Sequence, residues 1–187
     1  MRVISGQARG LKLKAPEGME TRPTTDRIKE SFFNIIAPDI YDADFLDLFS
    51  GSGAIGIEAL SRGAGSAVFV DESLKSIEVI RDNLERARLI DRAEVIQGNV
   101  LSVIGALGNR NKSFDIIFMD APYSKGLTEA SLQAVVQAKI LKPKGYIVAE
   151  QAVDEASLNI NGLEVYRIKD YKRTTKMTFL RLKEENQ

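Results

Sequence analysis

The stretch "DLFSGSGAIG", Asp47–Gly56, decides the fold of this sequence. The apolar run "ADFLDLF" leads into it and predicts a buried strand, and "AIGIEALSRG" leads out of it with the apolar spacing of a helix. Between them, Gly51, Gly53 and Gly56 form the pattern G-x-G-x-x-G. The first two glycines let the backbone turn tightly and approach a ligand, and the helix N-terminus adds partial positive charge. The stretch therefore predicts a cofactor-binding loop, although a tight strand-to-helix turn without a ligand shows the same pattern.

Polar residues near the ends of three predicted strands indicate which cofactor binds. Asp47 precedes the glycines, where its carboxylate could accept from a ligand ammonium group, directly or through water. Asp71 ends the strand "SAVFVD", where an acid can bind both hydroxyls of a ribose. Asn99 follows the strand "AEVIQ", where its amide could pair with an adenine edge. Ammonium, ribose and adenine together describe S-adenosylmethionine (SAM). The alternatives are an acid at a helix N-terminus for Asp71 and a turn residue for Asn99.

A nicotinamide dinucleotide would also fit the glycine pattern. A dinucleotide fold prefers a second mononucleotide-binding half. Here the last two predicted strands, "LEVYRIKDY" and "KMTFLRL", follow each other with no helix between them. They predict a hairpin that places an antiparallel strand in the sheet. SAM is therefore favoured over a nicotinamide cofactor, and calorimetry with both ligands would decide between a methyltransferase and an oxidoreductase.

The remaining segments alternate between helix and strand patterns. "TRPTTDRIKESFFNII" predicts a helix from about Thr25. Its expected buried face consists of Ile28, Phe32, Ile35 and Ile36. "SLKSIEVIRDNLERARL" predicts an amphipathic helix with Ser73 as N-cap, and "EASLQAVVQAKIL" predicts a helix that ends at "KPKG". "FDIIFMD" and "YIVAEQ" predict strands. We therefore expect an α/β protein with a Rossmann-like, mostly parallel seven-stranded sheet, helices on both faces and an antiparallel C-terminal hairpin.

Composition excludes several kinds of chemistry. The 187 residues suit one domain, and the sequence contains no cysteine and no histidine. Disulfides, zinc sites, thiol nucleophiles and histidine bases are therefore not expected, and we predict no metal site. No apolar run approaches the roughly 20 residues of a membrane helix. The start lacks the apolar core of a signal peptide, so a cytoplasmic protein without a membrane partner is expected.

Positive charge gathers at both ends of a chain whose net charge is zero. We expect residues 1–22 to form a basic, β-containing arm that contacts an anionic partner, and residues 23–187 to form the main domain. The residues of the arm that we expect to contact this partner all precede the first acid, and they are Arg2, Arg9, Lys12 and Lys14. A second basic stretch lies near the C-terminus. This distribution favours a local anionic partner, while the alternative is that the basic residues lie on solvated strand faces.

The stretch "FMDAPYSKG", Phe118–Gly126, supplies candidate catalytic residues. An exocyclic amine of a base is a weak nucleophile, because its lone pair delocalises into the ring. The Asp120 carboxylate and a loop carbonyl could hold its hydrogens and direct the lone pair at a methyl group. Pro122 would stiffen the loop, and Tyr123 would stack on an extruded base. The alternative is a strand that ends in a polar turn with a half-buried tyrosine.

These residues resemble the acid-x-Pro-aromatic signature of amino-methyltransferases, and the chain resembles the RsmD family nearly end to end. The most specific stretches are "TRPTTDRIKESFFNII" and "DLFSGSGAIGIEALSRGA", supported by "RVISGQARGLKLKAP", "DAPY" and "GYIVAEQ". The resemblance implies a class I SAM-dependent methyltransferase that modifies the N2 amine of a guanine in 16S ribosomal RNA. It also implies a partner that is ribosomal RNA, within a small-subunit particle.

The resemblance assigns the site residues as follows. It implies SAM contacts by Asp47, Gly51, Gly53, Asp71 and Asn99, and contacts to the target amine by Asp120, Pro122 and Tyr123. Two positions depart from the family pattern. Ala121 stands where the family usually has proline, which should reduce rigidity but keep the carbonyl. Asn99 stands where aspartate is common, and its amide can both accept and donate a hydrogen bond at the adenine edge.

Two further functions remain open at this point. The same motif serves amino-methyltransferases that act on adenine N6 in nucleic acid or on a protein glutamine. A non-catalytic assembly factor that binds RNA would keep the fold without turnover. A methyl-transfer assay on ribosomal particles would separate an enzyme from an assembly factor.

Overall fold

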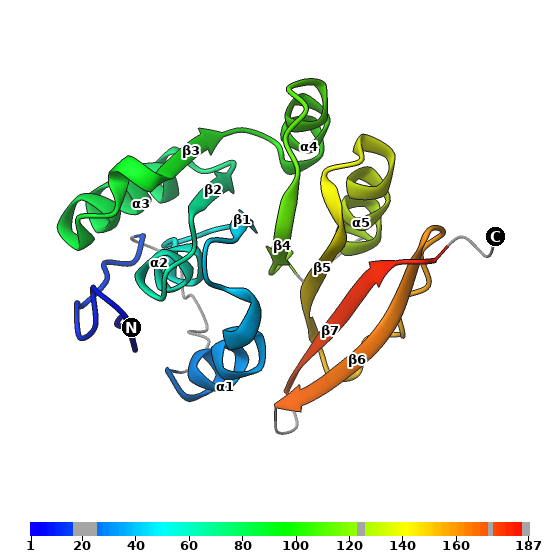
Figure 1. Ribbon diagram of the computed structural model, residues 1–187, viewed down its shortest axis with the longest axis horizontal. Helices are drawn as coiled ribbons and strands as arrows, with labels where there is room; N and C mark the ends of the chain where they lie inside the picture. Colours follow the sequence, from blue (N-terminus) through cyan, green and yellow to red (C-terminus); the bar gives the residue numbers. More distant parts are fainter. Residues whose placement is uncertain (17–25, 123–125, 172–173, 185–187) are drawn as a thin grey trace. The chain divides into compact units, whose positions relative to one another are not determined.

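The computed structural model describes residues 1–16, 26–122, 126–171 and 174–184. The chain divides into two compact units, residues 1–99 and residues 100–187 (Figure 1). The elements of the first unit are α1 (Asp26–Ile36), a 3-10 turn (Ala37–Asp39), β1 (Asp44–Leu48), α2 (Ala54–Ser61), β2 (Ser66–Asp71), α3 (Leu74–Ala87), a second 3-10 turn (Ile90–Arg92) and β3 (Ala93–Gln97). The elements of the second unit are α4 (Val100–Asn109), β4 (Phe114–Met119), α5 (Leu127–Ala138), β5 (Leu141–Ala152), β6 (Leu163–Tyr171) and β7 (Thr175–Leu182).

The described strands form a seven-stranded sheet in the order β3-β2-β1-β4-β5-β7-β6. In the first unit β1 pairs with β2 and β2 with β3, all parallel. In the second unit β4 and β5 are parallel, and β7 runs antiparallel to both β5 and β6. The predicted Rossmann-like sheet with an antiparallel C-terminal hairpin is therefore confirmed.

Strands β1 and β2 form the core of the first unit. Phe45, Leu46 and Leu48 are fully buried on β1, and Phe69 and Val70 are fully buried on β2. Runs of consecutive apolar residues are typical of parallel strands covered on both faces. Because the strand ends are aligned by this pairing, the polar residues that follow β1 and β2 meet at one edge of the unit.

Helix α1 begins where the sequence predicts, but its buried face differs from the prediction. The buried residues are Lys29, Phe32, Phe33 and Ile36, whereas Ile28 and Ile35 are half-buried. Lys29 is buried because its ammonium group bonds to the Glu58 carboxylate on α2. The predicted face therefore left out Lys29 and Phe33, and it wrongly included Ile28 and Ile35.

Two features of the second unit also differ from the expectation. Helix α4 was not predicted, since Gly105 and Gly108 lower its helix propensity, although Val103, Ile104 and Leu107 form a buried stripe. Helix α5 ends at Ala138, earlier than the predicted end at "KPKG", and "KPKG" itself belongs to strand β5, which begins at Leu141. The β4–β5 register shifts across this stretch, which shows that it forms an irregular bulge.

The beginning of the chain packs on the helices of its own unit. The backbone N–H groups of Ile4 and Ser5 donate to the Glu58 carboxylate at 2.8 and 3.0 Å. Further along, Asn83 of α3 accepts from the backbone N–H of Lys14 and donates to the carbonyl of the same residue. An antiparallel bridge joins Arg2 and Lys12. The predicted β-containing arm therefore exists within residues 1–16, and it is bound to α2 and α3 by its backbone.

Candidate functional site

The three glycines of the loop between β1 and α2 have different structural roles. Gly51 and Gly53 adopt left-handed conformations, with φ of 55° and 76°. A Cβ atom on Gly51 would meet nothing within 4 Å, so this backbone faces open space that a ligand can approach. A Cβ atom on Gly56 would lie 2.3 Å from the Phe69 ring, so this glycine lets α2 pack on β2. Gly51 therefore presents bare backbone to a ligand, while a Cβ atom on Gly53 would lie 3.2 Å from the Ile80 side chain.

Asp71 holds the glycine loop from the end of β2. One carboxylate oxygen accepts from the backbone N–H of Gly51 at 2.8 Å, and the other accepts from the backbone N–H of Ser73 at 2.9 Å. The side chain is half-buried. Each carboxylate oxygen can accept more than one hydrogen bond. Asp71 is thus oriented by the loop and still has acceptor capacity for the hydroxyls of a ribose.

Asp47 is buried beneath the loop, with only 2% of its surface exposed. Its carboxylate accepts from the backbone N–H of Gly56 at 2.9 Å, in the first turn of α2. This bond satisfies a donor that has no partner within the helix and places negative charge at the positive end of the helix. Asp47 therefore has a structural role, while its contact with a ligand ammonium group stays a prediction.

Ser50 is a loop residue that the sequence analysis missed. Its hydroxyl donates to the carbonyl of Asp47 at 2.6 Å and accepts from the backbone N–H of Val70 at 3.0 Å. The backbone N–H of Ser50 also donates to the carbonyl of Val70 at 3.0 Å. These bonds fasten the loop to β2. A serine directly before the first glycine is the sequence signal that could have indicated this role.

Asn99 lies just before α4 and is exposed. Its predicted contact with adenine is untested by the structure. In the glycine loop, the open backbone at Gly51 and the oriented carboxylate of Asp71 suit the backbone and ribose contacts that a nucleoside-containing cofactor needs. The residues of this loop therefore fit SAM.

Asp120 directly follows the last residue of β4. Its side chain reaches solvent, and yet the surrounding protein desolvates the carboxylate and raises its pKa from 3.8 to about 6. A carboxyl group with such a pKa is typical of functional sites, although structural groups also show it. The Asp120 carboxyl group is therefore mostly ionised near neutral pH, although its desolvation disfavours the charged form. A hydrogen-bond donor from a ligand would stabilise that charged form.

The residues after Asp120 are only partly described. Ala121 is buried and Pro122 is exposed. Tyr123 lies outside the described residues, so the predicted stacking on a base is not tested. The exposed position of Pro122 leaves its predicted role in stiffening the loop untested as well.

The basic residues of the arm differ in their surroundings. Arg2 forms an exposed ion pair with Asp26 at 3.1 Å, and Lys14 forms one with Asp82 at 3.1 Å. Arg9 and Lys12 are exposed, and among the described residues their side chains form no ion pair. Exposed ion pairs are weak, so all four cations can still contribute to an interaction with phosphates.

Three cations of the basic stretch near the C-terminus contact neighbouring residues of the second unit. Lys176 is buried on β7, and its ammonium group donates to the carbonyl of Glu155. Arg181 pairs with Glu164 at 2.6 Å and lies over the ring of Tyr166. Arg167 lies over the ring of Phe179. Of this basic stretch, Lys172 and Arg173 lie outside the described residues.

The described ranges contain neither a membrane-spanning helix nor a cluster of metal-binding side chains. None of their helices combines the length and the apolar character that crossing a membrane requires. The same ranges contain no group of three or more His, Cys, Asp or Glu side chains that could hold a metal ion.

The chain is similar to methyltransferases along most of its length. A family model described as "Conserved hypothetical protein 95" matches residues 1–180. YlbH of Bacillus subtilis strain 168, named as a candidate rRNA methyltransferase, is 43% identical over 150 residues, which are 80% of this chain and 82% of YlbH. Ribosomal RNA small subunit methyltransferase D of Escherichia coli K12 is 36% identical over 163 residues, which are 87% of this chain and 77% of that protein.

A solved structure supports the same relationship. YhhF from Escherichia coli, described as a candidate methyltransferase, matches with a TM-score of 0.86 at 33% identity. The match covers 97% of this chain and 98% of that chain. The Rossmann-like class I methyltransferase fold expected from the sequence is thereby confirmed. Because the family model spans nearly the whole chain and both relatives exceed 30% identity, this chain belongs to the conserved hypothetical protein 95 family, which is the RsmD family.

Proposed function

We propose that this protein transfers a methyl group from SAM to the exocyclic N2 amine of a guanine in small-subunit ribosomal RNA. The observation that carries the proposal is the Asp120 carboxyl group, which directly follows β4, reaches solvent and has a pKa raised to about 6. A relative that is 36% identical is named as a methyltransferase of small-subunit ribosomal RNA, which supports this class of substrate. The choice of guanine N2 over other amines comes from the family resemblance.

The methyl donor is SAM, which supplies an electrophilic methyl group on a sulfonium centre. The open backbone at Gly51 lets the donor approach the loop, and Gly53 lets the loop turn into α2. Asp71 accepts from the ribose hydroxyls with the oxygens that the loop already orients. Asp47 lies beneath the loop and attracts the ammonium group, and Asn99 binds the adenine edge.

Asp120 acts on the acceptor amine. Its carboxylate accepts one hydrogen of the amine, and a carbonyl of the following loop accepts the other. With SAM bound, the nitrogen lone pair would point at its methyl group, and transfer of that group would break the carbon–sulfur bond and leave its electrons on sulfur. The nitrogen carries positive charge during this step, and the adjacent carboxylate stabilises that charge. The extra proton leaves the nitrogen to the carboxylate or to water.

Pro122 and Tyr123 support the acceptor. Pro122 restricts the loop so that its carbonyl stays oriented, and Tyr123 stacks on the extruded base. The cations of the arm bind phosphates of the RNA. The family resemblance is the reason for proposing ribosomal RNA within a small-subunit particle as the partner.

The experiment is methyl transfer from labelled SAM to small-subunit particles isolated from cells that lack this protein. The RNA is then digested to nucleosides and analysed by mass spectrometry. N2-methylguanosine at a single site is the expected product. Detection of N6-methyladenosine would show that the substrate is an adenine and not a guanine. Label in protein would point to a glutamine side chain as the substrate. No transfer to RNA or protein, together with tight RNA binding, would favour an assembly factor.

A further inference from the structure

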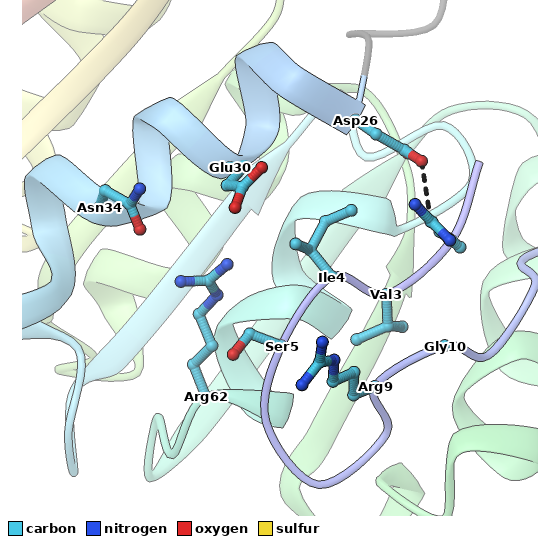
Figure 2. Close-up of a pocket in the computed structure, with 10 residues that line it drawn as sticks. Val3, Ile4, Ser5, Arg9, Gly10, Asp26, Glu30, Asn34 and Arg62 are labelled. Atoms are coloured by element: carbon cyan, nitrogen blue, oxygen red, sulfur yellow. Dashed lines mark hydrogen bonds and ion pairs between the residues drawn. The ribbon is translucent and has the colours of Figure 1, made fainter.

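A polar cavity of about 420 Å³ lies within the first unit, between the arm, α1 and the end of α2 (Figure 2). Its volume lies in the usual range of small-molecule sites. The lining includes Arg9 of the arm, Arg62 at the end of α2, and Glu30 and Asn34 of α1. Figure 2 shows these four side chains extending into the space between the three segments. Arg2 and Asp26 also line the cavity and pair with each other at 3.1 Å, so the guanidinium groups of Arg9 and Arg62, the Glu30 carboxylate and the Asn34 amide are the polar groups left for a ligand.

Arg62 is held in place by its neighbours. Its Nε atom donates to the Glu58 carboxylate at 2.8 Å, and its guanidinium group lies 4.9 Å from the centre of the Phe33 ring. Glu58 is fully buried. The terminal nitrogens of Arg62 remain available at the cavity, since no described residue accepts from them. A guanidinium group that is fixed before the ligand arrives loses little conformational entropy on binding.

The arm wall of the cavity is also fixed. Gly6 packs so closely on α2 that a Cβ atom would lie 1.8 Å from the carbonyl oxygen of Ser61. The hydroxyl of Ser61 donates to the carbonyl of Ser5 and accepts from the backbone N–H of Ala8. Arg9 follows directly in this turn, with an exposed side chain. The turn therefore presents Arg9 to the cavity from a rigid position.

The opposite wall is formed by α1. Glu30 and Asn34 are one helical turn apart, so they lie on the same side of the helix. Both are exposed, and among the described residues neither side chain has a recorded partner. This wall offers hydrogen-bond acceptors and an amide beside the two guanidinium groups.

The charges of Arg9, Arg62 and Glu30 limit which kinds of ligand can bind in the cavity. A simple anion would be repelled by Glu30, and a simple cation would be repelled by Arg9 and Arg62. A nucleotide presents an anionic phosphate at one end and a base edge with donors at the other. Among the four bases, guanine has two adjacent N–H donors, on N1 and N2, that one carboxylate can accept side by side.

We infer that this cavity binds one nucleotide of the RNA substrate, with guanine as the preferred base. Arg9 and Arg62 bind its phosphate, and Glu30 and Asn34 bind its base edge. This site is separate from the glycine loop, because Gly53 and Arg62 flank α2 at its two ends and lie about 13.5 Å apart along the helix axis. The inference rests on the proposed function, and it gives the RNA a second contact that fixes its register.

The first test measures binding of the full-length protein to unmethylated small-subunit particles. Arg9→Ala and Glu30→Gln should each weaken binding about 10-fold, as expected for the loss of one charge-assisted hydrogen-bonded contact. Their matched controls are Arg81→Ala and Glu78→Gln, which change exposed residues of α3 outside the cavity. SAM affinity and thermal stability should not change in any of the four variants. If the cavity variants bind particles like their controls, the inference is overturned.

The second test does not depend on methyl transfer. In NMR titrations, guanosine 5′-monophosphate should shift the backbone amides of Ser5, Arg9 and Asn34 at lower concentration than uridine 5′-monophosphate does. Glu30→Gln should remove this preference, while inorganic phosphate should bind Glu30→Gln more tightly than the wild type, because the carboxylate that repels a simple anion is then absent. Equal shifts by both nucleotides in the wild type would overturn the guanine assignment. Active methyl transfer without nucleotide shifts at the cavity would overturn this inference and leave the proposed function standing.

Discussion

At the scale of single residues, Asp120 combines access to solvent with a raised pKa. If its ionised form accepts a hydrogen of the target amine, the single-turnover rate should rise with pH and level off above about pH 6. Asp120→Ala should lower the rate about 100- to 1000-fold. Asp120→Asn should keep more activity than Ala and lose the pH dependence, because an amide oxygen accepts a hydrogen bond at every pH. The measurement is methyl transfer between pH 5 and pH 8, with SAM binding measured separately for each variant; a wild-type profile in Asp120→Asn would contradict the assignment.

A rise in pH should lower the contribution of Asp120 to folding stability, although it raises the methyl-transfer rate. Because the pKa is raised from 3.8 to about 6, the native state binds more protons than the unfolded state between these values. The contribution of Asp120 to stability therefore falls as pH rises through this interval and stays low above it. Asp120→Asn should consequently be more stable than the wild type at pH 7 and lose this advantage near pH 4. Urea denaturation at both pH values provides the measurement.

The loop glycines allow a matched pair of substitutions. Gly51→Ala places a methyl group in open space, so it should reduce SAM affinity and cost about 1 kcal/mol of stability because of the positive φ. Gly56→Ala places a methyl group against the Phe69 ring, so it should cost about 1–3 kcal/mol of stability through overpacking. Calorimetric SAM titration and urea denaturation measure the two effects. A larger loss of SAM affinity in Gly56→Ala than in Gly51→Ala, with the fold intact, would contradict these roles.

At the scale of elements, α1, α2 and the arm meet at the Glu58 carboxylate. It accepts from the ammonium group of Lys29 at 3.2 Å, from Arg62 and from the backbone of the arm. Burial lowers the pKa of Lys29, while the adjacent Glu58 carboxylate opposes this shift. Glu58→Ala leaves Lys29 buried without its counter-charge, so it should destabilise the protein by about 3–5 kcal/mol.

Lys29→Met, compared with Glu58→Ala, tests whether the unpaired lysine causes this loss of stability. It removes the buried cation and leaves Glu58 with its bonds to Arg62 and the arm backbone, so it should cost less than Glu58→Ala. The double variant should be more stable than the sum of the two single losses implies, because the unpaired lysine is then absent. Urea denaturation of the three variants gives the coupling energy, and strict additivity would show that the pair does not act as a unit.

At the scale of the whole molecule, the equal numbers of positive and negative residues, 26 each, imply no strong overall attraction to RNA. Binding should then depend on local cations such as Lys12, which is exposed on the arm. Lys12→Glu should reduce the slope of log affinity against log salt by about 1 and leave SAM affinity unchanged. Lys75→Glu, an exposed charge reversal on α3, is the control. An unchanged slope in Lys12→Glu would mean that this part of the arm is a solvated surface.

The sequence by itself determined the order of the seven strands along the chain, the hairpin at the end and the loop at Gly51. These features depend on local patterns: runs of apolar residues, helical periodicity and glycines at positions that need a left-handed backbone. The N-cap at Ser73 was predicted for the same reason, and its side chain accepts from the backbone N–H of Ser76. Asp71 could be placed near the loop because parallel strands end at the same edge of a sheet.

Only the tertiary structure decided how the arm packs, that Lys29 is buried and that the cavity beside α1 exists. The bond from the Ile4 backbone to Glu58 spans 54 residues, and the bond from the Lys14 backbone to Asn83 spans 69. No local pattern specifies such partners, because a buried charge is tolerated only where distant segments supply its counter-charge and hydrogen bonds. In the sequence, this arrangement is indicated only by Glu58, the one acid in the apolar helix α2. Which groups Glu58 binds depends on how distant segments pack against it.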